Sequence, residues 1–232
     1  MKAYPTEAAL CAAFTEQAEA HGWDVYAEIG AWDLVIVHRG PHGVIPTGAQ
    51  VGVQAKLRPT LGLVEQLTRD PGARIGPDVR AMLLPEWHLE ASRIARNLGA
   101  ALLRPTSGNS IERLILPESW NPPRVWRTPE TRLWLPPVKP SYSGGAPCPR
   151  KLSRWRVGAL KLCARLRRGE PIVAADFRAA GLSASEPSSW RRRAWVERVG
   201  KGPQAVYFLG PRSAGLPDVG YEAERDAIAA LP

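Results

Sequence analysis

Asp33-Leu34-Val35-Ile36-Val37 places an acid ahead of a run of aliphatic and β-branched residues, which predicts a buried strand. Val51-Gly52-Val53-Gln54-Ala55-Lys56 predicts a second short strand, and the residues between the two are rich in glycine and proline. Side chains two apart on a strand share a face, so Gln54 and Lys56 are expected to point the same way. If the strands pair, Asp33, an amide oxygen and an ammonium meet at one edge of the sheet. That combination is suited to a metal-dependent phosphodiesterase.

The pattern on either side of these strands predicts a complete α/β domain over residues 1–118. Thr6 is a suitable cap for a helix that has Glu7 in its first turn. The predicted helices are 7–20, 61–69 and 88–98, and the further predicted strands are 23–29, 79–84, 100–103 and 111–116. Helices alternating with strands in this order favour a mixed sheet flanked by helices.

Residues 119–150 are predicted to form an extended linker, because prolines recur through them and interrupt any helix or central strand. Trp120, Trp126 and Trp134 lie there among arginines. We expect them to pack against a neighbouring surface, because exposed tryptophans are costly. Stacking on nucleic-acid bases is the functional alternative.

Residues 151–212 predict a small winged helix-turn-helix domain. Helices are expected over 155–168 and 173–180, and a third begins at Ser183 or Ser185 and runs to Val199. A strand at 204–209 follows the third helix. Residues 213–232 are predicted to be a C-terminal tail with a short helix at 222–230.

The third helix of this domain and the turn after it carry a cluster of cations suited to a DNA groove and its phosphates. The predicted DNA-binding residues are Arg191, Arg192, Arg193, Arg198 and Lys201.

The net charge of +9 is divided unevenly along the chain. Residues 1–120 carry 11 Lys/Arg against 13 Asp/Glu, whereas residues 121–232 carry 20 against 9. Such asymmetry predicts that the second half binds a polyanion, most simply nucleic acid. The alternative is a solvated basic surface that keeps the protein soluble.

Composition also narrows the setting. No apolar run approaches the roughly 18 residues of a membrane span, and the N-terminus does not resemble a secretory signal, so no membrane partner is expected. Three cysteines without CxxC spacing predict neither a zinc site nor a disulfide framework. A reducing, cytoplasmic location is the simple inference.

Residues 1–118 resemble the PD-(D/E)xK nucleases, which have the restriction-endonuclease-like fold. Asp33 matches the acid that begins the family's second core strand, and Gln54 and Lys56 match the acid-x-Lys of the third strand with Gln replacing the acid. Similar Gln variants include the Mrr-like restriction nucleases. The stretches 28–33 and 55–58 look most like small phage or prophage nucleases, which implies the cytoplasm of a bacterium or of a phage-infected cell.

The resemblance implies one Mg²⁺ or Mn²⁺ ion held by Asp33, Gln54 and the carbonyl of Ala55. Lys56 would hold the attacking water and stabilise developing charge. Glu7 fits the helix-borne Glu that often accompanies the motif, and in that role it would bind a metal-bound water or a second metal. Because Gln replaces an acid, weak metal binding is expected unless Glu7 or Glu28 compensates.

Each of these residues also has a structural interpretation. Asp33 could cap a turn, and Gln54 and Lys56 could be outward-facing residues of an edge strand. Glu28 is predicted to be a solvated strand residue, with contact to the metal or its water as the alternative.

The predicted function is therefore a Mg-dependent deoxyribonuclease, most simply an endonuclease, bound to DNA through its C-terminal domain. Cutting both strands commonly takes two sites, which makes a homodimer a candidate assembly. The alternative is a catalytically inactive nuclease-fold protein that binds DNA as a regulator. A role with RNA is a third class, but no RRM or KH signature supports it.

Overall fold

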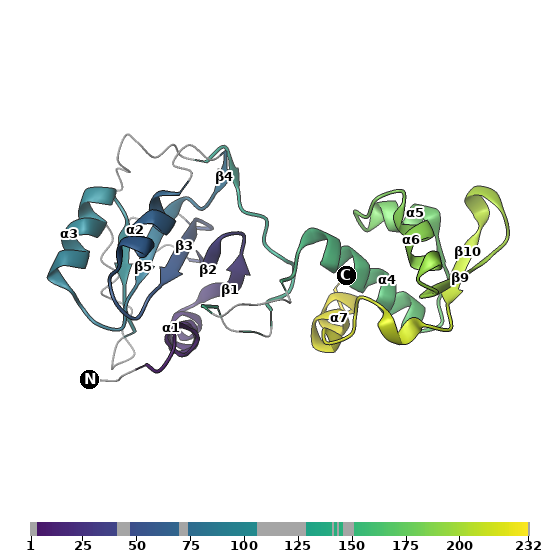
Figure 1. Cartoon of the computed structure of the whole chain (residues 1–232), viewed down its shortest axis with the longest axis horizontal. Coiled ribbons are helices and arrows are strands. Elements are labelled where there is room, and N and C mark those ends of the chain that lie inside the picture. The colour runs from purple at the N-terminus through teal and green to yellow at the C-terminus, as the bar shows by residue number, and fades with distance from the viewer. Residues whose placement is uncertain are drawn as a thin grey trace. The chain divides into compact units, whose positions relative to one another are not determined.

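The computed structural model describes residues 4–40, 47–69, 74–105, 129–140, 142, 144–145 and 151–231. The chain divides into two compact units (Figure 1). The first comprises Met1–Leu135 and Tyr142–Pro149, and the second comprises Pro136–Ser141 and Arg150–Pro232.

The first unit is an α/β structure built on a mixed sheet. Its elements in chain order are α1 (Glu7–Ala20), β1 (Trp23–Ile29), β2 (Trp32–His38), β3 (Gln50–Ala55), α2 (Leu61–Thr68), β4 (Ile75–Gly76), β5 (Val79–Leu83), α3 (Leu89–Leu98), β6 (Ala101–Leu103) and β7 (Thr131–Arg132). Among the described residues, the main sheet has five strands in the order β1-β2-β3-β5-β6. β1, β2 and β3 are antiparallel neighbours, whereas β5 and β6 run parallel to β3.

Helices cover both faces of this sheet (Figure 1). On one face, Leu10, Cys11 and Phe14 of α1 pack against alternate residues of the strands, including Val51 and Val53. On the other face, α2 and α3 pack on a second apolar cluster that includes Leu63, Leu67, Ala91 and Ala95. The central strands are buried on both sides, which explains why their sequences read as nearly continuous apolar runs.

The first unit extends past the boundary that the sequence predicted at residue 118. Leu133 and Leu135 pack against the α2–α3 side of the core. The Gln50 side chain donates to the Leu133 carbonyl and accepts from the Leu133 amide, both at 2.9 Å. β4 also pairs with β7 in parallel. Part of the predicted linker therefore belongs to the first unit, because Leu133 and Leu135 pack against its core.

Some predictions fall outside the described residues: the strand at 111–116, the tryptophans Trp120 and Trp126, and Cys148.

The second unit combines helices with a small sheet. Its elements are α4 (Arg154–Arg167), β8 (Ile172–Val173), α5 (Ala174–Ala179), α6 (Glu186–Arg192), β9 (Val196–Val199), β10 (Val206–Leu209) and α7 (Glu222–Ala229), with 3₁₀ turns at Gly202–Gln204 and Ser213–Gly215. The sheet order is β8-β10-β9, with both pairings antiparallel. Trp190 and Phe177 are fully buried at the centre of this unit's core.

The third helix of this unit is shorter than the sequence predicted. We expected it to run to Val199, but α6 ends at Arg192 and Val196–Val199 forms β9 instead. Ala194 adopts a left-handed conformation with φ 56°, and the Trp195 amide donates back to the Trp190 carbonyl at 3.0 Å. This turn ends the helix without a glycine, brings the Trp195 ring against Trp190 and leaves Val196–Val199 to pair with β10.

The predicted C-terminal tail is an integral part of the second unit. Helix α7 packs against α4, and Leu216, Tyr221 and Ile228 are buried. None of the helices in the described residues has the length and apolar character needed to cross a bilayer.

Candidate functional site

The start of β2 and the end of β3 meet at one end of the central sheet. Leu34 pairs with Val53 in antiparallel register, which places the backbone at Asp33 beside Gln54 and Ala55. An Asp33 carboxylate oxygen accepts a hydrogen bond from the Ala55 amide at 2.8 Å. Two motif segments separated by some 20 residues are thus joined by a direct contact.

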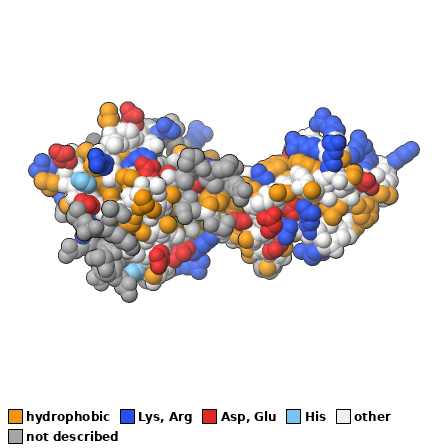
Figure 2. Space-filling model, turned by 60° about the horizontal axis from the view of Figure 1, so that its bottom comes forward, with side chains coloured by type: hydrophobic (Ala, Val, Ile, Leu, Met, Phe, Trp, Pro, Cys, Tyr) orange, Lys and Arg blue, Asp and Glu red, His pale blue; other side chains and the backbone are white. Residues whose placement is uncertain are grey.

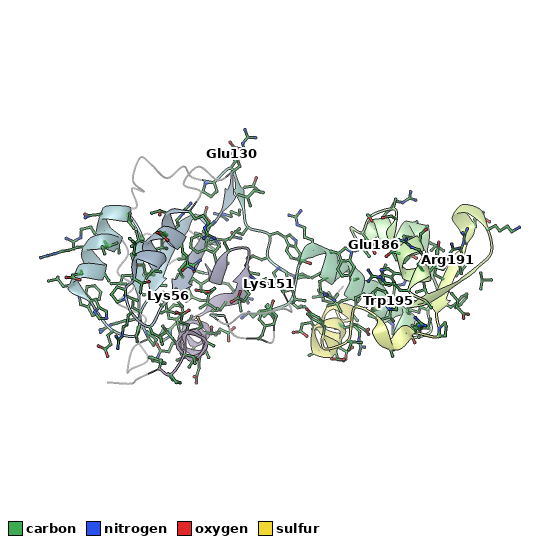
Figure 3. All side chains as sticks on the ribbon, viewed as in Figure 1. Lys56, Glu130, Lys151, Glu186, Arg191 and Trp195 are labelled. Carbon is green, nitrogen blue, oxygen red and sulfur yellow. The ribbon has the colours of Figure 1, made fainter. Side chains whose placement is uncertain are left out.

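Lys56 follows β3 immediately and extends the same cluster to α1. Its ammonium lies 2.8 Å from a Glu7 carboxylate oxygen, and the two side chains are 22% and 31% exposed. Figure 3 labels Lys56. Thr6 caps α1 by accepting from the Ala9 amide at 3.1 Å, which fixes Glu7 in the first helical turn. The sequence prediction that Glu7 accompanies Asp33 and Lys56 therefore corresponds to a real convergence of three elements.

The electrostatic environment of Asp33 is that of a partly desolvated carboxylate. Burial raises the pKa of Asp33, and the negative charges of Glu28 and Glu7 raise it further. The Ala55 amide and the Lys56 ammonium oppose this shift by stabilising the charged form. A carboxylate whose pKa is raised by desolvation beside a cation is typical of functional sites, although ion-pair networks also produce it.

Gln54 is buried, with only 3% of its surface exposed, and its amide nitrogen donates to the Ala31 carbonyl at 2.6 Å. β3 lies between β2 and β5, so the interpretation of Gln54 as an outward-facing residue of an edge strand is wrong. The hydrogen bond turns the amide nitrogen toward the β1–β2 turn. A buried glutamine that is held in this way has a structural function in addition to any role as a ligand.

Glu28 is the residue that sequence reasoning undervalued. It was predicted to be a solvated strand residue, but it is 9% exposed. It lies in β1 between residues that pair with Leu34 and Trp32, and hence across from Asp33. Its φ of 57° is left-handed, which is unusual for a non-glycine residue in a strand. One carboxylate oxygen accepts from the Gly145 amide at 3.1 Å. No local signal in the sequence pairs position 28 with position 145.

Cys11 lies under this cluster on α1 and is fully buried. Burial raises the pKa of its thiol, and the charges of Asp33, Glu28 and Glu7 raise it further. A thiol in that environment stays protonated, so we assign Cys11 a packing role and no nucleophilic one.

The donor chemistry of this end of the sheet suits a hard divalent cation, because it offers carboxylate and backbone oxygens. The carboxylates are nevertheless engaged within the protein: Asp33 by the Ala55 amide, Glu7 by Lys56 and Glu28 by the Gly145 amide. Across the part of the chain that the structure describes, no three His, Cys, Asp or Glu side chains are grouped as metal ligands. Asp33 accepts from the Ala55 amide through one carboxylate oxygen, and a cation bound to the other oxygen would take its other ligands from backbone and water.

The second unit carries the predicted DNA-binding cations on two adjacent elements and the turn beside them. Arg191 and Arg192 end α6, Arg193 caps it, Arg198 lies on β9, and Lys201 lies in the connection between β9 and β10. All are exposed. Figure 2 shows Lys and Arg side chains gathered on the surface of this unit. The helix thus carries two of the five predicted cations, Arg193 caps it, and Arg198 lies on the hairpin.

Contacts of partly buried side chains hold α6 in place. The Glu186 carboxylate accepts from the indole nitrogens of Trp155 and Trp190, at 2.9 and 3.1 Å, and so ties α6 to α4. The Arg193 guanidinium lies 4.7 Å from the centroid of the Trp195 ring. Figure 3 labels Glu186, Arg191 and Trp195. Arg191 and Arg192 are therefore presented by a rigidly seated helix.

Comparisons of the chain with protein-family models, curated proteins and solved structures found no match to any of the three.

Proposed function

We propose that this protein is a Mg²⁺-dependent deoxyribonuclease that hydrolyses phosphodiester bonds, most simply as an endonuclease. The observation that carries the proposal is the convergence of Asp33, Lys56 and Glu7 from three separate elements at one end of the sheet. An acid and an ammonium brought together beside partly accessible carboxylates form an arrangement able to act on a phosphate.

The chemistry assigned to the chain's own residues follows from this geometry. Asp33 provides fixed negative charge at the strand end, and the Ala55 amide holds its carboxylate in one orientation. The Lys56 ammonium would donate hydrogen bonds to the attacking water and to a nonbridging phosphate oxygen, and Glu7 would orient it. A bound Mg²⁺ would neutralise charge on the scissile phosphate. Asp33 and the Ala55 carbonyl are the ligands we propose for it, with Gln54 through its amide oxygen.

The architecture of the first unit supports the same proposal. An antiparallel β1-β2-β3 meander preceded by a helix and extended by parallel strands matches the element order expected of a restriction-endonuclease-like fold. We propose that fold on the element order together with the positions of Asp33 and Lys56. A fold alone does not establish an activity, so the side-chain cluster remains the stronger support.

We further propose that the second unit is a winged-helix DNA-binding domain. Its order α4-β8-α5-α6-β9-β10 places a hairpin directly after the helix that bears Arg191 and Arg192. Such a helix would enter a groove while Arg198 and Lys201 of the hairpin contact phosphates. The affinity would then come largely from phosphate neutralisation.

One observation favours a second candidate, a catalytically inactive nuclease-fold protein that binds DNA. Gln54 stands where the nuclease motif has an acid, and its amide nitrogen donates a hydrogen bond to the Ala31 carbonyl. With Gln54 the site would have one negative charge fewer than a site with Asp or Glu at this position, and the lower charge would weaken cation binding. A regulator would bind DNA through the second unit and use the first as a scaffold or a dimerisation unit.

Two aspartates allow a matched test, because each accepts a hydrogen bond from the backbone at one end of β3. Asp33 accepts from the Ala55 amide at 2.8 Å, and Asp78 accepts from the Gln50 amide at 2.7 Å. Both Asp33→Asn and Asp78→Asn remove a charge that caps a backbone amide of the same strand. We expect nicking of supercoiled plasmid in Mg²⁺ or Mn²⁺ to be lost in Asp33→Asn and retained in Asp78→Asn.

Lys56→Ala completes the experiment. Metal-dependent nicking lost in Asp33→Asn and Lys56→Ala, with DNA binding intact, supports the nuclease. DNA binding by the wild type without cutting in any divalent metal favours the inactive scaffold. Nicking that survives both substitutions would place the active site elsewhere in the molecule.

A further inference from the structure

Two glycines far along the chain lie against the candidate site. Gly144 is buried next to the Asp33 carbonyl and the Leu34 side chain. Gly145 lies over Cys11 and the backbone of Glu7, and its amide donates to Glu28 at 3.1 Å. This dipeptide, which we call the glycine strap, therefore contacts residues of α1, β1 and β2 at once.

The packing of the strap requires glycine at both positions. A Cβ atom on Gly144 would lie 2.1 Å from the Asp33 carbonyl oxygen, which is a collision with backbone. A Cβ on Gly145 would lie 3.0 Å from the Cys11 sulfur and from the Glu7 carbonyl group, and Gly145 has a φ of 76°. The strap therefore packs with its backbone directly against Asp33, Cys11 and Glu7, which only glycine allows.

The contact of the strap with Glu28 connects it to the chemistry of the site. Left-handed φ values in non-glycine residues persist only where the surrounding structure imposes them. Glu28 has such a φ beside the tight β1–β2 turn, and the hydrogen bond from Gly145 to its carboxylate helps to hold the residue in that conformation. Released from the strap, Glu28 would be expected to relax toward ordinary strand geometry, and its carboxylate would turn away from its present place across from Asp33.

Resting on the proposed function, we propose that the glycine strap is a positioning element of the nuclease site. It holds the Glu28 carboxylate opposite Asp33, where Glu28 supplies the negative charge that Gln54 does not. Glu28 then acts through water and through the field it adds at Asp33, since its oxygen is already bonded to Gly145. The candidate site is consequently assembled from the N-terminal part of the chain, which supplies Glu28 and Asp33, and from the glycine strap at residues 144–145.

Gly22 offers a matched control for the strap. It lies in the first unit with a φ of 80°, close to that of Gly145, but an added Cβ there meets nothing within 4 Å. Gly22→Ala and Gly145→Ala therefore carry similar backbone strain, and only the second disturbs the site. Glu28→Gln is a further variant, because a glutamine oxygen can still accept from Gly145 while the charge is gone.

The test has two readouts on the full chain. Amide hydrogen exchange in metal-free protein reports whether residues 28–33 stay protected, and titration calorimetry with Mn²⁺ reports cation affinity. We expect Gly145→Ala to speed exchange at residues 28–33 and to weaken Mn²⁺ binding about tenfold, equivalent to about 1.4 kcal/mol. Gly22→Ala should lower the melting temperature without either effect. Glu28→Gln should weaken Mn²⁺ binding and leave exchange unchanged.

Two results would overturn the proposal: exchange at residues 28–33 in Gly145→Ala that matches Gly22→Ala, or full Mn²⁺ affinity in both Gly145→Ala and Glu28→Gln. Failure of the proposed function looks different. In that case wild-type protein neither binds Mn²⁺ nor cuts DNA, and the exchange experiment alone then decides whether the strap positions Glu28.

Discussion

The ion pair between Lys56 and Glu7 is partly open to water, so it contributes little to folding and is available for chemistry. Its side chains keep 22% and 31% of their surface exposed. Pairs in such surroundings typically contribute at most about 1 kcal/mol to stability. The site and the fold are therefore separable at this residue.

Lys56→Met tests that separation. We expect the rate of plasmid cleavage to fall by on the order of 10²-fold or more, as for loss of one preorganised donor, while the free energy of unfolding changes by less than about 1 kcal/mol. Single-turnover cleavage and urea denaturation measure the two quantities. A large loss of stability with cleavage per folded molecule preserved would assign Lys56 a structural role.

The Asp33 carboxylate is expected to lower the stability of the fold, in contrast to the nearly neutral Lys56–Glu7 ion pair. Burial raises the pKa of its carboxyl in the native state, so the charged form costs stability, and that cost grows as pH rises through the native pKa. Asn keeps an oxygen that can accept from Ala55 without the charge. In EDTA, Asp33→Asn should thus be as stable as the wild type near pH 4 and more stable at pH 7. A variant less stable than the wild type at pH 7 would mean that the Lys56 attraction outweighs desolvation.

At the scale of elements, the packing of α7 on α4 depends on one buried carboxylate. Asp218 is 1% exposed and accepts from Arg167 at 3.0 and 3.1 Å and from Arg225 at 2.9 Å. Burial alone would raise the pKa of Asp218, but the hydrogen bonds from the two arginines outweigh it and hold the pKa below its ordinary value. The C-terminal segment is therefore tied into the second unit by charge as well as by apolar contacts.

Asp218→Ala should accordingly destabilise the second unit by about 2–4 kcal/mol, because two arginines lose their shared partner. Asp226→Ala is a control, since its carboxylate also pairs with Arg225 but is 68% exposed. The sign of the pH dependence follows from the lowered pKa: the contribution of Asp218 is present above about pH 4 and lost as pH falls through the native pKa. Thermal unfolding from pH 2 to 7 measures both effects. Equal losses of stability in Asp218→Ala and Asp226→Ala would contradict a special role for the buried Asp218 carboxylate.

For the whole molecule, the uneven charge distribution predicts how it binds DNA. The C-terminal half carries the whole of the cationic excess, and Arg191 and Arg192 are exposed at the end of α6. If each contacts one phosphate, replacing both with Ala should weaken binding across unrelated DNA sequences and reduce the slope of log K against log[salt] by about 2.

The measurement is fluorescence anisotropy with short duplexes between 50 and 300 mM NaCl. Arg93→Ala combined with Arg96→Ala, on α3 of the first unit, removes the same charge from the other half of the chain and should leave the slope nearly unchanged. Equal losses of slope from the two double variants would show that nonspecific charge, and no particular surface, governs binding.

Local pattern in the sequence was sufficient for most elements of the fold. The apolar runs beginning at Trp23, Asp33, Val51 and Val79 predict β1, β2, β3 and β5 to within a residue or two, because a strand buried on both faces needs a continuous apolar sequence. Thr6 and Gly99 mark helix ends through capping chemistry. The candidate residues Asp33, Gln54 and Lys56 were also identifiable, since short strands joined by a hairpin bring their ends together.

Only the tertiary structure decided features that depend on distant contacts. Helix α6 stops at Arg192 and Val196–Val199 pairs with β10 instead, whereas the sequence favours helix up to Val199. Leu133 joins the first core through Gln50, and the glycine strap reaches Glu28 across more than 100 residues of sequence. Periodicity and capping residues reflect interactions within a short segment of the chain. These contacts gain their free energy from groups brought together by the fold, and no local pattern in the chain encodes them.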